Sequence, residues 1–362
     1  MQRDGGRKCS AGSLLLSLAA ALACGPAATG PAEPVTGGGR APAPLRGTGD
    51  AGTTTATGGD DDGGNDAATD DPTATEGGGT VPDPTPRGEY VGPGTVVHSA
   101  AEFVAAVAPG ARIVLAADEI DLSDLWPEVT IPLWDDTRGG PPPPAGTDHV
   151  RWTNPYDGWQ LEIHDVEQLA IVGHGSPPPR LVTNPRGSFV LKFVEADGIT
   201  LENLTLGHTT PGFCRGGVLA FEDVTGLEVR DADLFGSGTY GLELVGVREA
   251  TFERLVVRDC TYGIAVIRNG KRVTFRNSTF RDNEEFELIE VERTPGVVFE
   301  RCLFEGNRTR GDYPFFAVTG SEVELIDSTF RSNAVDVFRR GEVRITSSTF
   351  EDNPFESTIS PI

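Results

Sequence analysis

Apolar and polar residues alternate with a period of two in short runs along the second half of the chain. In one such run, residues 273–283, Val273 and Phe275 lie on one side of the chain, and the pattern resumes at Phe280 after an interruption at Asn277. Alternation with β-branched and aromatic residues predicts strands. The interruption predicts a sharp bend between two short strands.

Versions of this run return at a nearly constant interval. Close copies occupy residues 297–307, 323–333 and 343–353, and looser ones begin upstream at Ile199, Leu227 and Ala250. Equivalent positions are separated by about 20 to 28 residues, an interval typical of solenoid repeats. The chain is therefore expected to stack similar coils on one another.

Each repeat also predicts a third strand. Eight residues before the third residue of each run lies another short apolar segment, in chain order VLKF, VLAF, GLEL, GIAVI, ELIEV, FFAV and VDVF. Three short strands in each repeat predict a triangular coil. Stacked coils would then form three parallel sheets around a single core.

These repeats resemble the right-handed parallel β-helix of the pectate-lyase-like superfamily, over about residues 95–355. The resemblance implies an all-β, three-sheet solenoid. Residues 100–107 predict a short amphipathic helix ahead of the first strand, which would cap the open N-terminal end of the solenoid.

The register of the repeats predicts columns of identical residues. One aromatic column points inward, and Cys302 lies between Ser278 and Ser328 in another. An asparagine column follows the aromatic one and is expected to hydrogen-bond exposed turn backbone and its own neighbours. The two columns are Phe280, Phe304, Phe330 and Phe350, and Asn283, Asn307, Asn333 and Asn353.

The front of the chain has a different composition. Residues 1–23 combine a basic start with an apolar run too short to span a bilayer as a helix, which predicts a signal peptide. The segment ending at Cys24 resembles a bacterial lipobox, and this implies lipidation of that cysteine. We therefore expect an exported protein, lipid-anchored to the bacterial cell envelope at the outer membrane, or extracellular. The membrane would be contacted only through the lipid.

Residues 24–90 are rich in Gly, Pro, Thr and Asp and have almost no large apolar residue, so we predict a disordered acidic linker. The β-helix domain is expected to follow at residues 91–362. The formal net charge of −24 argues against nucleic acid as a partner. No feature of the sequence predicts association, so a monomer is expected.

Three of the five cysteines fall in the repeats. Cys214 and Cys260 occupy equivalent sites two coils apart, about 9.6 Å if each coil rises by one inter-strand spacing. This separation exceeds the reach of a disulfide. Together with Cys302 they are predicted to be free, mostly buried thiols.

Candidate chemistry follows the third strand. Its outward positions form a file of charged residues interrupted by alanines. The file consists of Lys192, Ala220, Glu243, Ala265, Glu290, Ala317 and Asp336. The resemblance implies that substrate lies across this sheet, beside the long turn before it, whose length varies most between repeats.

Carboxylates and tyrosines in this region suit a sugar ligand. The sequences GTYG and CTYG place Tyr240 under Tyr262 and beside Glu243, and such rings can bind a sugar face or simply pack along the solenoid. Glu243 and Glu290 lie two coils apart, about 9.6 Å. If the two side chains tilt toward each other, the separation of their carboxyl groups could fall within the range of an inverting glycosidase pair. A solvated charged strip remains the alternative.

The resemblance also implies what a lyase would need, namely an arginine or lysine base and a cation that neutralises the uronate. Lys192 and Arg215 are the basic candidates, and His208 lies in the same long turn as Arg215. The central turns lack a dense aspartate cluster of the calcium-binding kind. We predict no cofactor and no metal site, with Ca²⁺ left possible.

All four tryptophans fall in one insertion, at about residues 123–160, which is also rich in proline. Loops of this length inside a compact domain are usually functional or disordered. Because exposed tryptophan is costly, the insertion is expected to pack along the N-terminal coils and to wall one end of the groove.

Two classes of function follow. In the first, the groove of a cell-envelope lipoprotein binds or processes an extracellular polysaccharide, as a lyase or glycoside hydrolase if it is an enzyme. In the second, the domain is a non-catalytic surface adhesion or structural module. The fold hosts both classes, so the sequence leaves enzymatic activity open.

Overall fold

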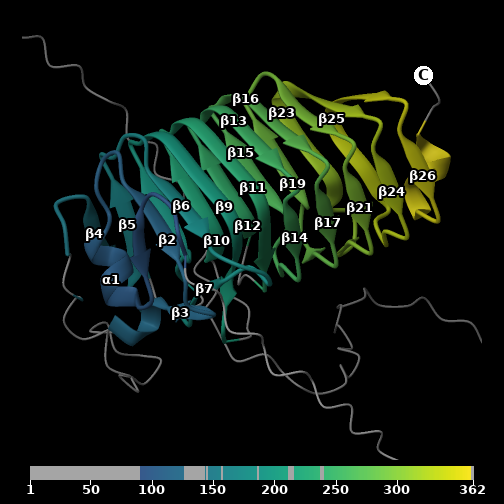
Figure 1. Cartoon of the computed structure of the whole chain (residues 1–362). Coiled ribbons are helices and arrows are strands. Elements are labelled where there is room, and N and C mark those ends of the chain that lie inside the picture. Colours follow the sequence, from purple (N-terminus) through teal and green to yellow (C-terminus); the bar gives the residue numbers. More distant parts are fainter. Residues whose placement is uncertain are drawn as a thin grey trace, which may run out of the picture. The chain divides into compact units, whose positions relative to one another are not determined.

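A computed structural model describes residues 90–125, 143, 146–155, 158–185, 187–210, 216–236 and 240–359. Within them, three columns of parallel strands stack coil on coil as a right-handed β-helix, which confirms the expected fold (Figure 1). The predicted signal peptide, anchor cysteine and linker lie outside the described residues.

Three faces make up the solenoid, and some long strands turn a corner and belong to two of them. The first face contains β1 (Thr95–Val97), β2 (Arg112–Leu115), β6 (Ala170–Gly173), the first halves of β9 (Asp197–His208) and β11 (Thr225–Phe235), β13 (Arg248–Glu253), β16 (Lys271–Arg276), β20 (Val297–Glu300), and the second halves of β23 (Pro314–Ile326) and β25 (Val337–Thr346). The second face contains β3 (Glu119–Asp121), β7 (Arg180–Thr183), the second halves of β9 and β11, β14 (Val256–Arg258), β17 (Thr279–Arg281), β21 (Leu303–Glu305), β24 (Thr329–Arg331) and β26 (Thr349–Glu351).

The third face carries the candidate chemistry. It contains β4 (Val150–Thr153), β5 (Gln160–His164), β8 (Leu191–Val194), β10 (Gly217–Glu222), β12 (Tyr240–Val245), β15 (Ala265–Arg268), β19 (Ile289–Glu292) and the first halves of β23 and β25. A short pair outside the faces joins β18 (Glu284–Glu285) to β22 (Arg308–Thr309).

Both ends of the solenoid are closed by other elements (Figure 1). At the N-terminal end, α1 (Ala100–Ala105) begins after Ser99, whose side chain accepts a hydrogen bond from the Glu102 amide, and it adds the buried Phe103 to the core. A 3₁₀ helix, η1 (Leu122–Leu125), follows β3, and a second, η2 (Pro354–Thr358), follows β26. The short helix at the N-terminal end agrees with the predicted cap.

Part of the tryptophan-rich insertion joins the third face. Strand β4 pairs antiparallel with β5, so that Trp152 lies opposite Leu161. This pairing covers the N-terminal edge of the face, as expected for an insertion that packs along the first coils. Trp126 and Trp134 lie outside the described residues.

Aromatic columns fill the core. The rings of Phe252, Phe275 and Phe299 stack with centroids 4.6 Å apart at both steps. On the second face the predicted column from Phe280 to Phe350 stacks at 4.9, 4.4 and 5.1 Å. Because each coil rises by about one inter-strand spacing of 4.8 Å, identical side chains meet in van der Waals contact.

The corner between the first and second faces is built from left-handed residues. In seven successive coils one residue there has φ between 49° and 55°, a region that most side chains avoid. The column is Asn203, Asp231, Arg254, Asn277, Arg301, Asp327 and Ser347. The bend predicted at Asn277 is therefore confirmed. The side chains bond along the column, since Arg301 Nε donates to Asn277 Oδ1 at 3.0 Å.

The asparagine column is a hydrogen-bond ladder, as predicted, but it is buried rather than placed at exposed turn backbone. Asn307 Oδ1 accepts from the amide of Asn283 at 3.1 Å and from its Nδ2 at 3.0 Å. Asn307 Nδ2 in turn donates to Asn333 Oδ1 and to the carbonyl of Phe280. At the last step Glu356 of η2 accepts from the Asn353 amide at 2.7 Å and so ends the ladder.

The register corrects two members of the charged file. Glu243 and Glu290 both pair with Val266 rather than Ala265, which is buried on the inner side. Side chains alternate with period two, so Ala265, two residues before the inward Ile267, must also point inward. In the last coil Ala317 pairs with Arg340 rather than Asp336, because the corner between the third and first faces is shorter there.

Cys260 and Cys302 are buried thiols that form no disulfide, which confirms that part of the thiol prediction. Cys214 lies outside the described residues. Cys302 stands between Ser278 and Ser328 as expected, and its amide donates to Ser328 Oγ at 3.1 Å. Burial raises the pKa of the Cys302 thiol to about 12, so this thiol stays protonated at neutral pH.

Replacing Asn307 by alanine tests the ladder. The change leaves the buried Asn283 amide and the Phe280 carbonyl without their partners, so we expect a loss of about 2–4 kcal/mol in the free energy of unfolding. Urea denaturation followed by circular dichroism measures this loss. Asn184→Ala, at a half-buried site outside the ladder, is the control and should change stability by less than about 0.5 kcal/mol. Equal effects of the two substitutions would contradict a structural role for the ladder.

Candidate functional site

Two outward rows of side chains run along the middle of the third face. The first passes through Glu162, Lys192, Ala220, Glu243, Val266 and Glu290, and the second, two residues further along each strand, through Glu222, Val245, Arg268 and Glu292. We call the charged members the charged strip. It consists of Glu162, Lys192, Glu222, Glu243, Arg268, Glu290 and Glu292.

Each cation of the charged strip lies between two carboxylates. Lys192 Nζ is 3.0 Å from Glu222 and 3.6 Å from Glu162. Burial alone would lower the pKa of Lys192, but these carboxylates outweigh it and raise that pKa. A lysine held in its charged form cannot remove a proton from substrate, so Lys192 is unsuited to act as the base of a lyase.

The N-terminal end of the strip is held by the β4–β5 hairpin. Glu162 is 4% exposed, accepts from Arg151 Nε at 2.6 Å and also binds Thr153. Burial pushes the pKa of Glu162 upward, but Arg151, Lys192 and Thr153 together lower it. This carboxylate is therefore ionised and fully engaged within the protein.

Tyr240 and Arg268 fix Glu290. The hydroxyl of Tyr240 donates to Glu290 Oε1 at 2.9 Å, although the two residues lie two coils apart. Arg268 Nη2 binds the other oxygen of Glu290, also at 2.9 Å. Burial and the nearby carboxylate raise the pKa of Tyr240, so its hydroxyl keeps the proton that makes this bond.

A ladder of aromatic rings borders the strip at the start of β12 and in the turns before β15, β19 and β23. Tyr240 meets Tyr262 edge-on at 6.4 Å, Tyr262 meets Phe286 at 4.5 Å, and Phe286 meets Tyr313 edge-on at 5.2 Å. All four side chains are half-buried. We call these four residues the aromatic ladder. The sequence predicted the contact between Tyr240 and Tyr262.

Glu243 differs from the other carboxylates of the strip. It is half-buried, and it makes no hydrogen bond or ion pair with another residue that the structure describes. Burial raises the pKa of Glu243, against the opposing effect of Arg268 and Lys192. A carboxyl group in this state can donate a hydrogen bond when protonated or receive a cation when ionised.

Of the remaining predicted residues, His208 is described and is not brought to this site. His208 is 5% exposed at the end of β9, with Nε2 3.0 Å from the Ser188 carbonyl oxygen, and this burial leaves it no open contact with a ligand on the third face. Arg215 and Cys24 lie outside the described residues. The hydroxyl of Tyr240, expected beside Glu243, is bound to Glu290 instead.

Sequence reasoning missed Arg268, Phe286 and Tyr313 as members of the site. Arg268 could have been found, because it lies two residues after Val266 and so shares its face. Phe286 and Tyr313 could also have been found, because each lies four residues before the outward residue of its strand, Glu290 or Ala317, as Tyr262 lies before Val266.

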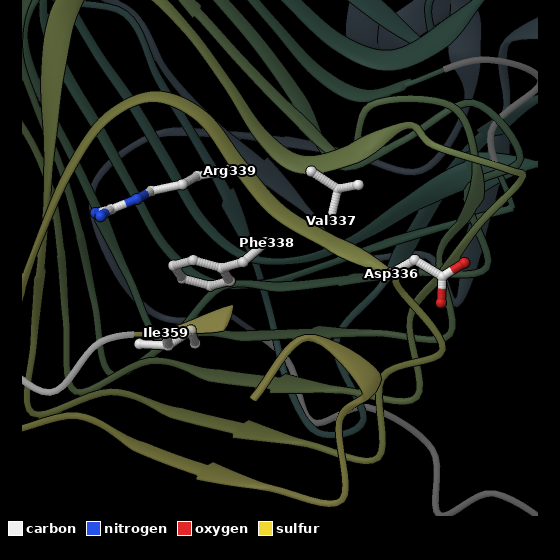
Figure 2. A pocket seen from close by; sticks show the side chains of 5 residues that line it. All are labelled: Asp336, Val337, Phe338, Arg339 and Ile359. Carbon is white, nitrogen blue, oxygen red and sulfur yellow. The ribbon is translucent and has the colours of Figure 1, made fainter. Parts of the chain in front are cut away.

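A hollow of about 280 Å³ lies at the C-terminal end of the solenoid, lined by Asp336, Val337, Phe338, Arg339 and Ile359 (Figure 2). The side chains of Phe338, Arg339 and Ile359 point into the end of the coil, whereas Asp336 points away from them. The hollow thus belongs to the end of the core. Glu243 and the aromatic ladder are not among the residues that line it.

Neither a metal-binding cluster nor a membrane-spanning helix is found among the described residues. These residues contain no group of three His, Cys, Asp or Glu side chains that could hold a metal ion. Within the same part of the chain, no helix is long and apolar enough to cross a membrane.

Comparison with known proteins agrees with the fold. Residues 194–359 match the family model described as "Right handed beta helix region". No curated protein sequence matches the chain.

Several solved structures are similar in fold. The surface protein and adhesin PfbA of Streptococcus pneumoniae is 8% identical with a TM-score of 0.37, over 67% of this chain and 74% of that one. An alginate lyase from Paenibacillus sp. str. FPU-7 is 12% identical with a TM-score of 0.32, over 71% and 98%. The A-module of the mannuronan C-5 epimerase AlgE4 of Azotobacter vinelandii is 11% identical with a TM-score of 0.26, over 56% and 84%. At these scores the likenesses carry no argument about a ligand or a reaction.

The raised pKa of Glu243 predicts how this residue affects stability as pH changes. A carboxyl group whose pKa is higher in the folded than in the unfolded protein stabilises the fold below its unfolded pKa. This contribution is lost as pH rises through the folded pKa. We therefore expect Glu243→Gln to melt at a higher temperature than wild type at pH 7, and at the same temperature at about pH 3, below both values.

Thermal unfolding across this pH range measures the difference in melting temperature between the two proteins. Titrating groups that both proteins share contribute to both melting temperatures and cancel in this difference. Glu351→Gln, an exposed carboxylate on the second face, is the control and should follow wild type throughout. A Glu243→Gln protein less stable than wild type at pH 7 would refute a raised pKa.

Proposed function

We propose that this right-handed β-helix protein binds an extracellular polysaccharide across its third face. The glycan lies along the aromatic ladder, with its hydroxyl groups directed to Glu243 and to the fixed pair of Tyr240 and Glu290. The observation that carries the proposal is the ladder itself, in which four half-buried aromatic side chains follow one another in successive coils, beside a carboxyl group that pairs with no described residue.

The geometry suits a polymer better than a single small molecule. Coils rise by about 4.8 Å, so the ladder offers a series of rings along the solenoid axis. Sugar rings pack their C–H faces on aromatic side chains, whose apolar bodies are costly to leave in water. A chain running along the axis would contact several rings at once, and the effects of weak contacts would add.

Binding without catalysis is the form of this function that the contacts favour. An inverting glycosidase needs one carboxylic acid and one carboxylate that activates water. Glu243 has the properties of the acid. Both oxygens of Glu290, however, are already bound, one by Tyr240 and one by Arg268, so a water molecule would have to compete with these donors to be activated.

A surface role is supported by the front of the chain. Export through residues 1–23, lipidation at Cys24 and a spacer over residues 24–90 would hold the third face away from the membrane, where it could meet a glycan. Such a protein would act as an adhesion module of the cell envelope.

Removing rings of the ladder tests the binding function. Tyr262→Ala and Tyr313→Ala should each weaken glycan binding about threefold to tenfold, because each removes one stacking surface. A glycan array followed by calorimetry on the glycans that bind measures the effect. Tyr90→Ala, which removes a half-buried tyrosine ring at the N-terminal end, is the control and should bind as wild type. Equal affinities of all three variants would remove the ladder from the site.

The anchor is tested independently. Cys24→Ser should move the protein from the membrane fraction to the soluble fraction of the envelope, because the thiol that carries the lipid is gone. Fractionation followed by immunoblotting measures the distribution, with Cys9→Ser as the matched control. Membrane association that survives Cys24→Ser would refute lipidation at this residue.

A further inference from the structure

The charged strip has an unequal balance of charge. Its seven members comprise five carboxylates and two cations, and Arg151 of β4 adds a third cation at Glu162. The described part of the strip is therefore negative by two elementary charges when all groups are ionised. This net negative charge repels a polyanionic glycan that approaches the aromatic ladder bordering the strip.

No cation of the strip is available to neutralise a uronate. Lys192 is held by Glu222 and Glu162, and Arg268 by Glu290 and, at 3.8 Å, by Glu292. A uronate that recruited either cation would leave half-buried carboxylates without their partners. Such unpaired charges cost more than the new contact would gain.

Glu243 is the group that this arrangement leaves available. It lies in the first row, with Ala220 and Val266 as its small neighbours on either side, and no described residue pairs with its carboxyl group. An ammonium group has three hydrogen-bond donors and forms short, charge-assisted bonds with a carboxylate. Glu243 is therefore placed to receive an amine.

The aromatic ladder gives a second and independent reason. Faces of tyrosine and phenylalanine rings attract a cation as well as an apolar sugar surface. Tyr240 lies at the start of β12, the strand that carries Glu243, and Tyr262 lies in the turn before β15, the next strand of the face. A cationic sugar would thus meet a carboxylate and aromatic rings together.

We propose that the ligand of the third face is a glycan that carries free amino groups, and that Glu243 binds one ammonium group of it. The proposal rests on the glycan-binding function proposed above and specifies its substrate class. In this proposal Glu243 discriminates between amino, neutral and uronic sugars. The aromatic ladder provides the affinity that is common to the three kinds of sugar.

Three oligosaccharides of equal length and linkage test the proposal, namely β-1,4-linked glucosamine, glucose and glucuronic acid. Calorimetry at about pH 6, where the amines are charged, measures binding to the full chain. We expect the glucosamine oligomer to bind about tenfold to a hundredfold tighter than the glucose oligomer, and the glucuronic acid oligomer to bind weakest.

Variants of the same protein assign this preference to one residue. Glu243→Gln should lose the advantage of the glucosamine oligomer and retain the affinity for the glucose oligomer. Glu351→Gln removes the same charge from the second face and should leave all three affinities unchanged. If both variants reduced glucosamine binding equally, the preference would be a long-range charge effect, and the assignment to Glu243 would be overturned.

The outcomes separate this proposal from the one on which it rests. Equal binding of the glucosamine and glucose oligomers, or strongest binding of the glucuronic acid oligomer, would overturn the amino-glycan inference and leave glycan binding intact. No binding of any oligomer by wild type, together with an empty glycan array, would overturn both.

Discussion

In-register stacking is the constraint on which the rest of this structure depends. Each coil places every side chain about 4.8 Å from the equivalent side chain of the next coil, so a residue type is tolerated only if it can contact its own kind or a complement. Phenylalanine meets this condition by stacking, and asparagine by donating to one neighbour while accepting from the other. A buried polar column is stable only when every member is satisfied, and Glu356 supplies the missing partner at the last step.

On the third face, equivalent positions do not carry the same residue type in successive coils. This difference explains why side chains there reach across coils. Small residues alternate with long ones along the row, so that Ala220 and Val266 leave room over which Lys192, Glu243 and Glu290 extend. Tyr240 reaches Glu290 past Gly263, where a Cβ atom would come within 3.4 Å of the tyrosine ring and 2.6 Å of the Glu287 carbonyl oxygen. A residue larger than glycine at position 263 would thus clash with the backbone of the next coil, whereas its Cβ atom would meet the tyrosine ring at an ordinary van der Waals distance.

The sequence predicted the fold well because the period and the alternation express the stacking constraint directly. The inward phenylalanines, the asparagine ladder and the bend at Asn277 could all be read from equivalent positions in the repeats. The left-handed backbone at the corner residues Arg254 and Arg301 could not be read from the sequence. Arginine intrinsically disfavours the left-handed backbone conformation. Here hydrogen bonds from the two arginines to Asp231 and Asn277 in the preceding coil maintain that conformation.

The site was predictable only where it follows the repeat. Glu243, Glu290 and the contact between Tyr240 and Tyr262 came from register alone. The shorter corner before Val343 displaced the last member of the file from Asp336 to Arg340, and a fixed offset cannot detect such a change. Nor could the sequence reveal that Tyr240 binds Glu290, since this depends on side-chain direction across two coils.

These contacts bear on whether the face could also carry out chemistry. Hydrolysis would require Glu290 to accept a proton from water, yet its oxygens are occupied by a neutral hydroxyl donor and a guanidinium group. A water molecule would have to compete with both donors for these oxygens. Glu243 is in the opposite state, because it is half-buried and has no partner among the described residues. One carboxyl group without a described partner beside one restrained carboxylate fits the proposed recognition of a sugar. Catalysis would require a ligand that displaces Tyr240 or Arg268 from Glu290.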